Sequence, residues 1–284
     1  MTAAGTHADC NSLSSYLKKP EPGGYTDSMA TAPTEPLSLL PRPDWALFLD
    51  IDGTLIDHAD HPEGVDIPTD LPDLLAQLQL ALDGAVALVS GRTIDWMDRR
   101  FAPTRLAASG QHGAEVRLAP DAPSVPIPLP RWRKPLEQAL DEVLSTWPGV
   151  YVEHKPLSLA VHFRAVPQFG EAIMDRVIQL GMGIDGGVEF LKGKYVIEVR
   201  QAGRNKGTAV AELMNSALFT GRRPVFLGDD VTDEDGFRAV RAAGGLALAV
   251  GPRPTDQADF RLASPSEVRR WLTDLPKALE RVDS

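Results

Sequence analysis

Residues 45–54, with the sequence WALFLDIDGT, constrain the fold of this chain more than any other stretch. Five apolar residues run without alternation into Asp50, and Gly53 and Thr54 end the pattern. A short, continuous apolar run is typical of a strand buried on both faces, as in the middle of a parallel sheet. Open α/β sheets bind their ligands at the carboxyl edge, where Asp50 and Asp52 then lie.

The two carboxylates at this edge suggest a bound cation. Asp50 and Asp52 are costly to remove from water unless a cation or hydrogen bonds compensate their charge, so the pair indicates a divalent metal. The alternative is a plain turn after the strand, because Asp and Gly are common turn residues. The rest of the chain has to decide between these interpretations.

Composition limits the location and the partners of the protein. The chain of 284 residues has room for one large or two modest domains, and 43% apolar residues suffice for a core. The net charge of −10 argues against binding to nucleic acid or to anionic membranes. Cys10 is the only cysteine, and neither a signal peptide nor a membrane-spanning apolar run is evident. We therefore expect a soluble, cytoplasmic protein.

The first third of the chain alternates between strands and helices. Residues 1–43, rich in Pro, Gly and Ser, predict a flexible extension. After the first strand, a polar loop at 55–68 contains four possible metal ligands, but its prolines and glycine favour a loop over a metal site; they are Asp57, His58, Asp60 and His61. Thr69 is expected to cap a helix that carries leucines at helical spacing from 71 to 82.

Two further strands continue this pattern. The run 85–89 predicts a buried strand that ends at Ser90, Gly91 and Arg92, and 106–109 predicts a short third strand. A helix between them is expected to begin near Thr93 or Asp95 and to place backbone N–H groups beside Ser90. Strand, helix, strand alternation predicts a doubly wound parallel sheet.

From about residue 116 to 200 the sequence has the texture of a second, α+β unit inserted in the first. A proline-rich stretch at 119–130 indicates a linker. Helices are expected at 132–147 and 169–180, and alternating strands at 150–153, 158–164, 188–191 and 195–199. Such alternation indicates an antiparallel sheet with helices on one face.

Apolar runs typical of buried parallel strands return after Gly203. Asn205 and Lys206 open a helix, residues 224–227 form a strand that leads into GDDVTDE, a helix runs from Asp233 to 240, and a last strand covers 246–250 before a final helix. Successive strand ends of a parallel sheet lie on one edge, so the polar groups there can converge. These groups are Asp50, Asp52, Thr54, Ser90, Lys206, Asp229 and Asp233.

In this order, DIDGT, the Ser-Gly-Arg strand end, Lys206 and GDDVTDE resemble the four signatures of the haloacid-dehalogenase-like (HAD) phosphatases. The resemblance covers residues from about 45 to 275. It implies a Rossmann-like core at 44–115 and 201–284 with an inserted C2-type cap at 116–200. It also implies that Asp50 is the nucleophile, which forms an aspartyl-phosphate, and that Asp52 is the general acid and base.

The chemistry is consistent with these roles. A carboxylate attacks phosphorus well only when Mg²⁺ screens its charge from that of the phosphate, and Asp50, Asp229 and the carbonyl of Asp52 can supply the ligands. Thr54, Ser90 and Lys206 fit as phosphate donors. Two acids are expected to have supporting roles: Asp233 to orient Lys206 or a metal-bound water, and Asp230 to act beside the metal ligands without binding the ion itself. Taken singly, Lys206 could be a solvated lysine and Ser90 a simple helix cap.

The middle region narrows the substrate. The segments 111–115 (QHGAE), 152–164 and 193–200 resemble those of trehalose-6-phosphate phosphatases, in which a mobile cap holds the sugar. The resemblance assigns sugar-binding roles in the cap to Glu153, Lys155, Lys194 and Glu198, and places Arg92 and His112 near the substrate. One departure is Arg200-Gln201-Ala202-Gly203, where family members usually continue with Arg-Pro, so the hinge there can differ.

The expected function is therefore Mg²⁺-dependent hydrolysis of trehalose 6-phosphate, in a protein that is favoured as a monomer. Three alternatives remain at this point: the same reaction on another sugar phosphate, a phosphomutase, and a non-catalytic sensor of sugar phosphates. A sensor normally lacks a catalytic carboxylate, and none is missing here.

Overall fold

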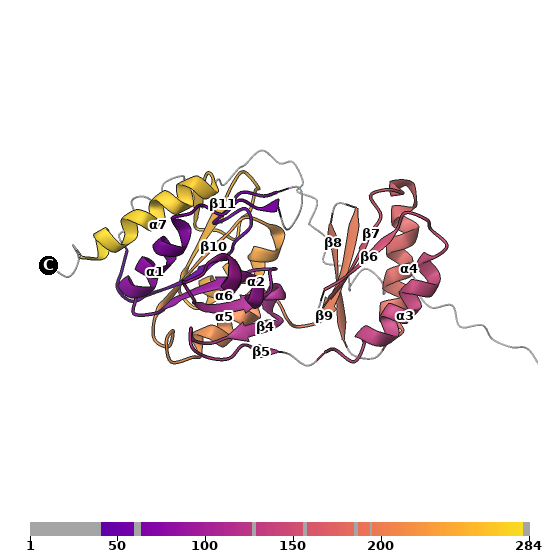
Figure 1. Cartoon of the computed structure of the whole chain (residues 1–284), viewed down its shortest axis with the longest axis horizontal. Helices are drawn as coiled ribbons and strands as arrows, with labels where there is room; N and C mark the ends of the chain where they lie inside the picture. The colour runs from indigo at the N-terminus through magenta and orange to yellow at the C-terminus, as the bar shows by residue number, and fades with distance from the viewer. Residues whose placement is uncertain are drawn as a thin grey trace, which may run out of the picture. The chain divides into compact units, whose positions relative to one another are not determined.

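The computed structural model describes residues 41–59, 64–126, 129–155, 158–184, 187–193 and 195–280. These residues form two compact units, one of residues 129–203 and one of the residues before and after that segment (Figure 1). The expected extension 1–43 lies outside the described residues except for 41–43. None of the helices among the described residues is long and apolar enough to cross a bilayer; α7, the longest of them, has 16 residues.

The larger unit is built on an eight-stranded sheet in the order β12-β11-β10-β1-β2-β3-β4-β5. All neighbouring pairs from β12 to β3 are parallel, and β4 and β5 are antiparallel additions at one end. The strands are β1 (Trp45–Leu49), β2 (Val86–Val89), β3 (Ala107–Gly110), β4 (Glu115–Arg117), β5 (Val125–Pro126), β10 (Arg223–Gly228), β11 (Leu246–Val250) and β12 (Phe260–Leu262). This mostly parallel sheet confirms the predicted α/β class.

Helices cover both faces of this sheet, because alternate residues of its buried strands point to opposite sides. Leu47 and Leu49 pack with α1 (Leu71–Ala81), α2 (Ile94–Arg100) and α7 (Pro265–Glu280), and α1 and α7 lie side by side. Ala46 and Phe48 pack with α5 (Lys206–Met214) and α6 (Glu234–Ala242) on the other face. Every residue of β1 is buried, as its apolar run predicted.

The smaller unit has a four-stranded antiparallel sheet in the order β6-β7-β9-β8. Its strands are β6 (Tyr151–His154), β7 (Ser158–His162), β8 (Val188–Gly193) and β9 (Val196–Gln201), and its helices are α3 (Arg133–Leu144) and α4 (Gly170–Met182) with the short η5 (Pro167–Phe169). One core of its own joins α3 and α4 to one face of the sheet through Leu159, Val161 and Ile197. We call this unit the cap.

The structure differs from the sequence prediction in the boundary between the units, in the linker and in the cap of α1. β4 and β5 pair within the larger sheet, so that unit continues past the expected boundary at 116 and resumes at 204 rather than 201. The predicted linker contains β5, whose proline sits on an edge strand, where a missing N–H is tolerated. Thr69 is not the cap of α1: Asp70 occupies that position and makes no side-chain capping bond.

Candidate active site

The end of β1 places Asp50 and Thr54 in the interior of the larger unit. Asp50 is 4% exposed, and its N–H continues the ladder to β10 by donating to the carbonyl of Leu227 at 3.0 Å. The chain then turns around the carbonyl of Ile51, which accepts from three following N–H groups, including that of Thr54. Gly53 allows this turn because its φ of +80° is unfavourable for other residues. The hydroxyl of Thr54 lies 3.3 Å from Asp50 Oδ2.

Lys206 crosses from the start of α5 to two buried carboxylates. Asn205 caps this helix with its side chain, which fixes where the first helical residue, Lys206, lies. Lys206 Nζ donates to Asp50 Oδ1 at 2.8 Å and to Asp233 Oδ1 at 2.6 Å. Lys206 is therefore not a solvated lysine, because its side chain is 3% exposed and forms two ion pairs.

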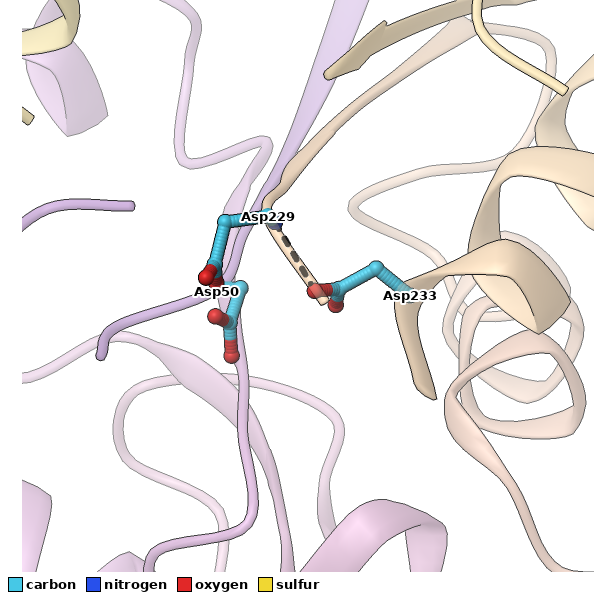
Figure 2. Close-up of side chains that lie close together, drawn as sticks. All are labelled: Asp50, Asp229 and Asp233. Carbon is cyan, nitrogen blue, oxygen red and sulfur yellow. Dashed lines mark hydrogen bonds between the residues drawn. The ribbon is translucent and has the colours of Figure 1, made fainter. Parts of the chain in front are cut away.

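The GDDVTDE loop after β10 is held by its own acids. Asp233 Oδ2 accepts hydrogen bonds from the N–H groups of Asp229 and Asp230, both at 3.0 Å. Asp230 Oδ1 accepts from the N–H and the hydroxyl of Thr232 and so caps the short helix η6 (Val231–Asp233). Asp233 and Asp230 thus shape the loop, while the carboxylate of Asp229 remains directed toward Asp50, as Figure 2 shows.

The pKa values describe a site with more buried negative charge than its lysine neutralises. Burial raises the pKa of Asp50 to about 7, against the attraction of Lys206. Burial and repulsion by Asp233 raise the pKa of Asp229 to about 6. Burial, then repulsion by Asp50, also raises the pKa of Asp233. For Lys206, burial lowers the pKa, but the surrounding carboxylates outweigh it and raise the pKa overall.

This excess of charge fits a cation. Asp50, Asp229 and Asp233 each offer an oxygen within 4.8 Å of the others (Figure 2). Asp233 accepts from Lys206 through Oδ1 and from two backbone N–H groups of its own loop through Oδ2. Asp50 Oδ2 and Asp229 Oδ1 instead share the hydroxyl of Thr54, at 3.3 and 3.5 Å, so these two carboxylates are the better ligands. A hard divalent ion such as Mg²⁺ prefers carboxylate oxygens as ligands, and it would neutralise the excess negative charge of this site.

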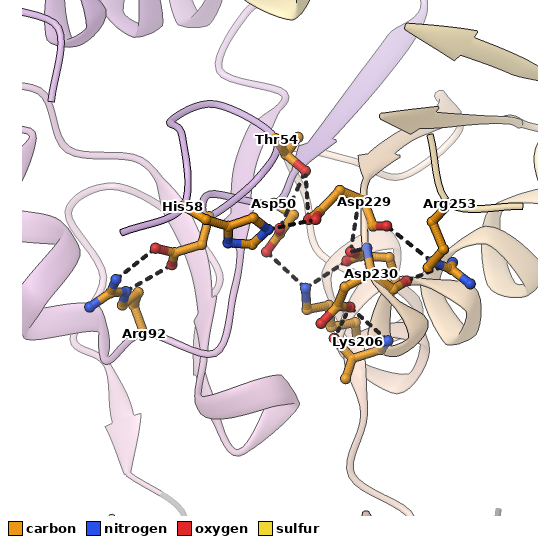
Figure 3. Close-up of polar contacts among 11 residues, drawn as sticks. Asp50, Thr54, His58, Arg92, Lys206, Asp229, Asp230 and Arg253 are labelled. Atoms are coloured by element: carbon orange, nitrogen blue, oxygen red, sulfur yellow. Dashed lines mark hydrogen bonds and ion pairs between the residues drawn. The ribbon is translucent and has the colours of Figure 1, made fainter. Parts of the chain in front are cut away.

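The carboxylate of Asp52 is not part of this triad. It is bound by Arg92 in a bidentate ion pair, with Nε to Oδ2 at 2.8 Å and Nη2 to Oδ1 at 2.6 Å. The Arg92 guanidinium also lies 4.4 Å from the ring centre of Trp96. Figure 3 shows Arg92 and Lys206 on opposite sides of Asp50. The sequence predicted both residues as functional but not their contact.

Ser90 and His112 lie at the next strand ends. Ser90 is buried, its Oγ accepts from the N–H of Arg92 at 3.3 Å, and its carbonyl accepts from the N–H of His112 at 3.0 Å. His112 belongs to the short helix η4 (Gln111–Gly113) and has a φ of 55°. Its ring packs against Gly91, where an added Cβ would lie 2.5 Å from Nε2. The structure thus brings His112 beside Ser90.

Sequence reasoning missed two residues beside the acidic triad. His58 Nε2 lies 3.0 Å from Asp229 Oδ2, although the loop of His58 was predicted not to be a site. Arg253 donates to the carbonyls of Asp229 and Asp230 (Figure 3). It follows the end of β11, so the rule that sites lie at the carboxyl edge could have indicated it. Both residues line a cavity of about 480 Å³ next to Asp229.

The cap holds a separate polar cluster on the sheet face opposite its helices. Glu153, Ala160 and Glu198 lie directly opposite one another across β6, β7 and β9, whereas the neighbouring Leu159 and Val161 point into the core beneath α3 and α4. Lys194 lies outside the described residues.

Two side chains contact Glu198 in this cluster. Its Oε1 accepts from Ser158 Oγ at 2.5 Å and from Lys155 Nζ at 3.5 Å. Glu153 Oε2 contacts His162 Nε2 at 3.0 Å, and the His162 ring stacks on Tyr151. Glu153, Lys155 and Glu198 therefore form ion pairs and hydrogen bonds within one face, rather than scattered surface charge.

Comparison with known proteins shows the same relationship over most of the chain. The family model for trehalose-phosphatases matches residues 48–266. The trehalose-6-phosphate phosphatase of Escherichia coli (strain K12) is 37% identical over 254 residues, which cover 87% of this chain and 93% of that protein. A probable trehalose-phosphate phosphatase of Sinorhizobium fredii (strain NBRC 101917 / NGR234) is 40% identical over 212 residues, 74% of this chain and 78% of the relative.

Solved structures show the same fold. The C-terminal domain of trehalose-6-phosphate phosphatase from C. albicans superposes with a TM-score of 0.71 at 23% identity, covering 88% of this chain and 99% of that domain. A phosphatase of the HAD superfamily from Bacteroides thetaiotaomicron gives a TM-score of 0.58 at 14% identity and covers 92% and 99% of the two chains. The chain belongs to the trehalose-phosphatase family.

Proposed function

We propose that this chain hydrolyses trehalose 6-phosphate to trehalose and inorganic phosphate, in trehalose biosynthesis. One observation carries the proposal: Lys206 pairs with the buried Asp50, beside Asp229, at the carboxyl edge of the parallel sheet. Phosphoryl transfer needs mainly the positioning of the reacting groups and the stabilisation of their charge. The desolvated carboxylate of Asp50, between Lys206 and Asp229, meets that need. The names of the relatives from Escherichia coli and Sinorhizobium fredii support the choice of substrate.

The proposal includes Mg²⁺ as the cofactor. Asp50 and Asp229 would hold the ion together with the backbone carbonyl of Asp52, and the raised pKa values of both carboxyls support a site that favours a cation. When bound, Mg²⁺ screens the charge of the attacking carboxylate from that of the phosphate.

Each residue at the site has a distinct role in the proposed reaction. An Asp50 oxygen bonds to phosphorus, and the bond from phosphorus to the sugar oxygen breaks while Asp52 gives that oxygen a proton. Asp52 then takes a proton from water, whose oxygen bonds to phosphorus and releases the Asp50 carboxylate. Lys206, Thr54 and Ser90 donate hydrogen bonds to the phosphate oxygens.

The sugar is assigned to a second set of side chains. Carboxylates accept hydrogen bonds from sugar hydroxyls and ammonium groups donate them, so a mixed set of both suits a disaccharide. The set consists of Glu153, Lys155, Lys194 and Glu198 of the cap, with Arg92 and His112 of the larger unit. Because Cys10 is the only cysteine, a reducing compartment suits the chain, and we propose a cytoplasmic location.

Phosphate release from trehalose 6-phosphate tests this function directly. The assay compares it with sucrose 6-phosphate, glucose 6-phosphate and a glucosylglycerate phosphate at equal concentration with Mg²⁺. We expect the highest kcat/KM for trehalose 6-phosphate. A higher kcat/KM for another sugar phosphate would correct the substrate, and binding without release of phosphate from any of them would indicate a sensor instead of an enzyme.

A further inference from the structure

Arg253 contacts the acidic loop from the side opposite to Asp233. Its guanidinium donates from Nε to the carbonyl of Asp229 at 3.1 Å, from Nη2 to the carbonyl of Asp230 at 2.9 Å, and from Nη1 to Glu234 Oε1 at 2.8 Å. The planar fork of an arginine can satisfy several acceptors at once, whereas a lysine presents one ammonium centre.

The backbone of Asp229 and Asp230 is therefore held through both its N–H groups and its carbonyls. Asp233 accepts from the N–H groups of Asp229 and Asp230, and Arg253 donates to their carbonyls. Figure 3 shows Arg253 on the far side of Asp229 and Asp230 from Lys206. Asp233 is fully buried, while the Arg253 side chain is 33% exposed, so the second contact can be altered at less structural cost.

The position of the Asp229 carboxylate depends on this backbone. The carboxylate lies so close to Gly53 that an added Cβ there would be 2.3 Å from Asp229 Oδ2. Its other oxygen lies 3.5 Å from Thr54 Oγ1. A small rotation of the Asp229 backbone therefore moves the carboxylate either into Gly53 or away from the oxygen of Asp50 with which it forms the triad.

We propose that Arg253 is a positioning residue for the divalent metal: it fixes the backbone of Asp229 and Asp230 so that the Asp229 carboxylate is oriented to bind the ion. This inference rests on the proposed Mg²⁺-dependent function. Groups that orient a metal ligand typically change metal affinity about 10- to 100-fold when they are lost. Because Asp233 still holds the N–H groups, loss of Arg253 lowers Mg²⁺ affinity about tenfold, at the lower end of that range.

The experiment compares Arg253→Gln with Arg238→Gln. Arg238 also lies near Glu234, with Nη1 3.9 Å from Glu234 Oε2, and it forms ion pairs with Glu234 and Asp235 on its own helix. The two variants therefore lose the same charge near the same acid. Mg²⁺ affinity is measured without substrate, by calorimetric titration, and independently as the Mg²⁺ concentration that gives half-maximal activity.

We expect Arg253→Gln to bind Mg²⁺ about tenfold more weakly and to need about tenfold more Mg²⁺ for half-maximal activity. At saturating Mg²⁺ its kcat should recover to within a few-fold of the wild type. Arg238→Gln keeps the wild-type affinity. Arg253→Lys retains most of the defect, because a lysine restores the charge but not the fork. Equal Mg²⁺ affinity in Arg253→Gln and Arg238→Gln overturns the inference, and so does full recovery of affinity in Arg253→Lys.

Two further results keep this test independent of folding and of the proposed function. If Arg253→Gln does not fold, Glu234→Gln keeps Arg253 and removes the carboxylate that it shares with Arg238. We then expect a smaller loss of Mg²⁺ affinity, and wild-type affinity in both Glu234→Gln and Arg253→Lys overturns the inference. A wild-type chain that binds no Mg²⁺ and releases no phosphate contradicts the proposed function itself, whereas an active wild type with an unaffected Arg253→Gln contradicts only the role of Arg253.

Discussion

Arg92 holds the carboxylate of Asp52 through two hydrogen bonds of 2.8 and 2.6 Å. The two residues follow the ends of neighbouring strands, β2 and β1. Bidentate pairing fixes the orientation of a carboxylate as well as its charge, and Arg92 is itself packed on Trp96. The proposed proton carrier is thus coupled to a residue that the resemblance assigns to the substrate.

This coupling predicts a non-additive pair of substitutions. Asp52→Asn removes the proton carrier, and we expect kcat to fall about 10²- to 10³-fold. Arg92→Gln leaves the carrier without its partner, and we expect kcat/KM to fall about tenfold, as for other groups that orient an active residue. If Arg92 acts through Asp52, the double variant is no slower than Asp52→Asn. Steady-state rates of the wild type, the two single variants and the double variant give the coupling energy between Asp52 and Arg92. Fully additive losses would contradict it; Arg99→Gln, in an exposed pair with Asp95, is the matched control.

Lys206 is the residue whose loss should affect folding most. Lys206→Met leaves Asp50 and Asp233 buried without their cation, and removing one partner of a buried pair costs about 3 to 5 kcal/mol. We expect the free energy of unfolding in urea to fall by that order, together with loss of turnover. Adding Asp233→Asn should recover part of the stability but no activity. Lys277→Met, in an exposed pair with Asp274, should have no effect on either measurement.

Asp50 should destabilise the metal-free protein at alkaline pH. Burial raises its pKa from 3.8 to about 7, so its contribution to stability is full below pH 3.8 and is lost as the pH rises through about 7. Asn carries no such charge. With chelator present, we expect Asp50→Asn to melt a few degrees above the wild type at pH 8 and to differ less at pH 5. A gain of equal size at both pH values would argue against a buried charged Asp50. The control is Asp95→Asn, which alters an exposed carboxylate paired with Arg99 and should not raise the melting temperature.

Removing the metal should lower the melting temperature, whereas removing the charge of Asp50 should raise it. A cation near Asp50 and Asp229 offsets their repulsion, so Mg²⁺ should raise the melting temperature of the wild type and chelator should abolish phosphate release. We expect the gain in melting temperature to be much smaller in Asp50→Asn. Phosphate release that persists in excess chelator and stays constant when Mg²⁺ is restored would exclude a metal-dependent reaction.

The sequence predicted the central strands and the convergence of the acids because both follow from strong local patterns. β1, β2, β11 and, after Arg223, β10 are apolar runs buried on both faces, and topology then brings their ends to one edge. β12 was missed because its three residues include Arg261 and carry no such run. The proline-rich stretch after residue 118 predicts a linker and gives no sign of β5, which has only two residues.

Contacts between side chains could not be predicted in the same way. Arg92 and Asp52 were each singled out, but nothing in the sequence says that they pair. His58 and Arg253 reach Asp229 from loops whose conformation depends on glycines and on tertiary packing. A sequence pattern identifies which residues come to the edge of the sheet, whereas the direction in which each side chain points is decided by the fold.

Ser158 offers a test of the cap that does not alter its charge. Its hydroxyl donates to Glu198 at 2.5 Å, and Lys155 contacts the same oxygen at 3.5 Å. A hydrogen bond to a charged group contributes about 1.5 to 3 kcal/mol, and because Lys155 remains, we expect Ser158→Ala to raise KM for trehalose 6-phosphate about fivefold with little change in kcat. Ser145→Ala, which removes an exposed hydroxyl bonded to a helix carbonyl, is the control.

The split between KM and kcat is what distinguishes this role from a structural one. If Glu198 holds a sugar hydroxyl, disorder of its carboxylate weakens substrate and transition state equally, so KM rises and kcat stays. Glu198→Gln should raise KM further, and Ser158→Ala should then add little to it, because both act through one carboxylate. A fall in kcat without a change in KM, or equal and additive effects of the two substitutions, would show that this face of the cap does not hold the sugar.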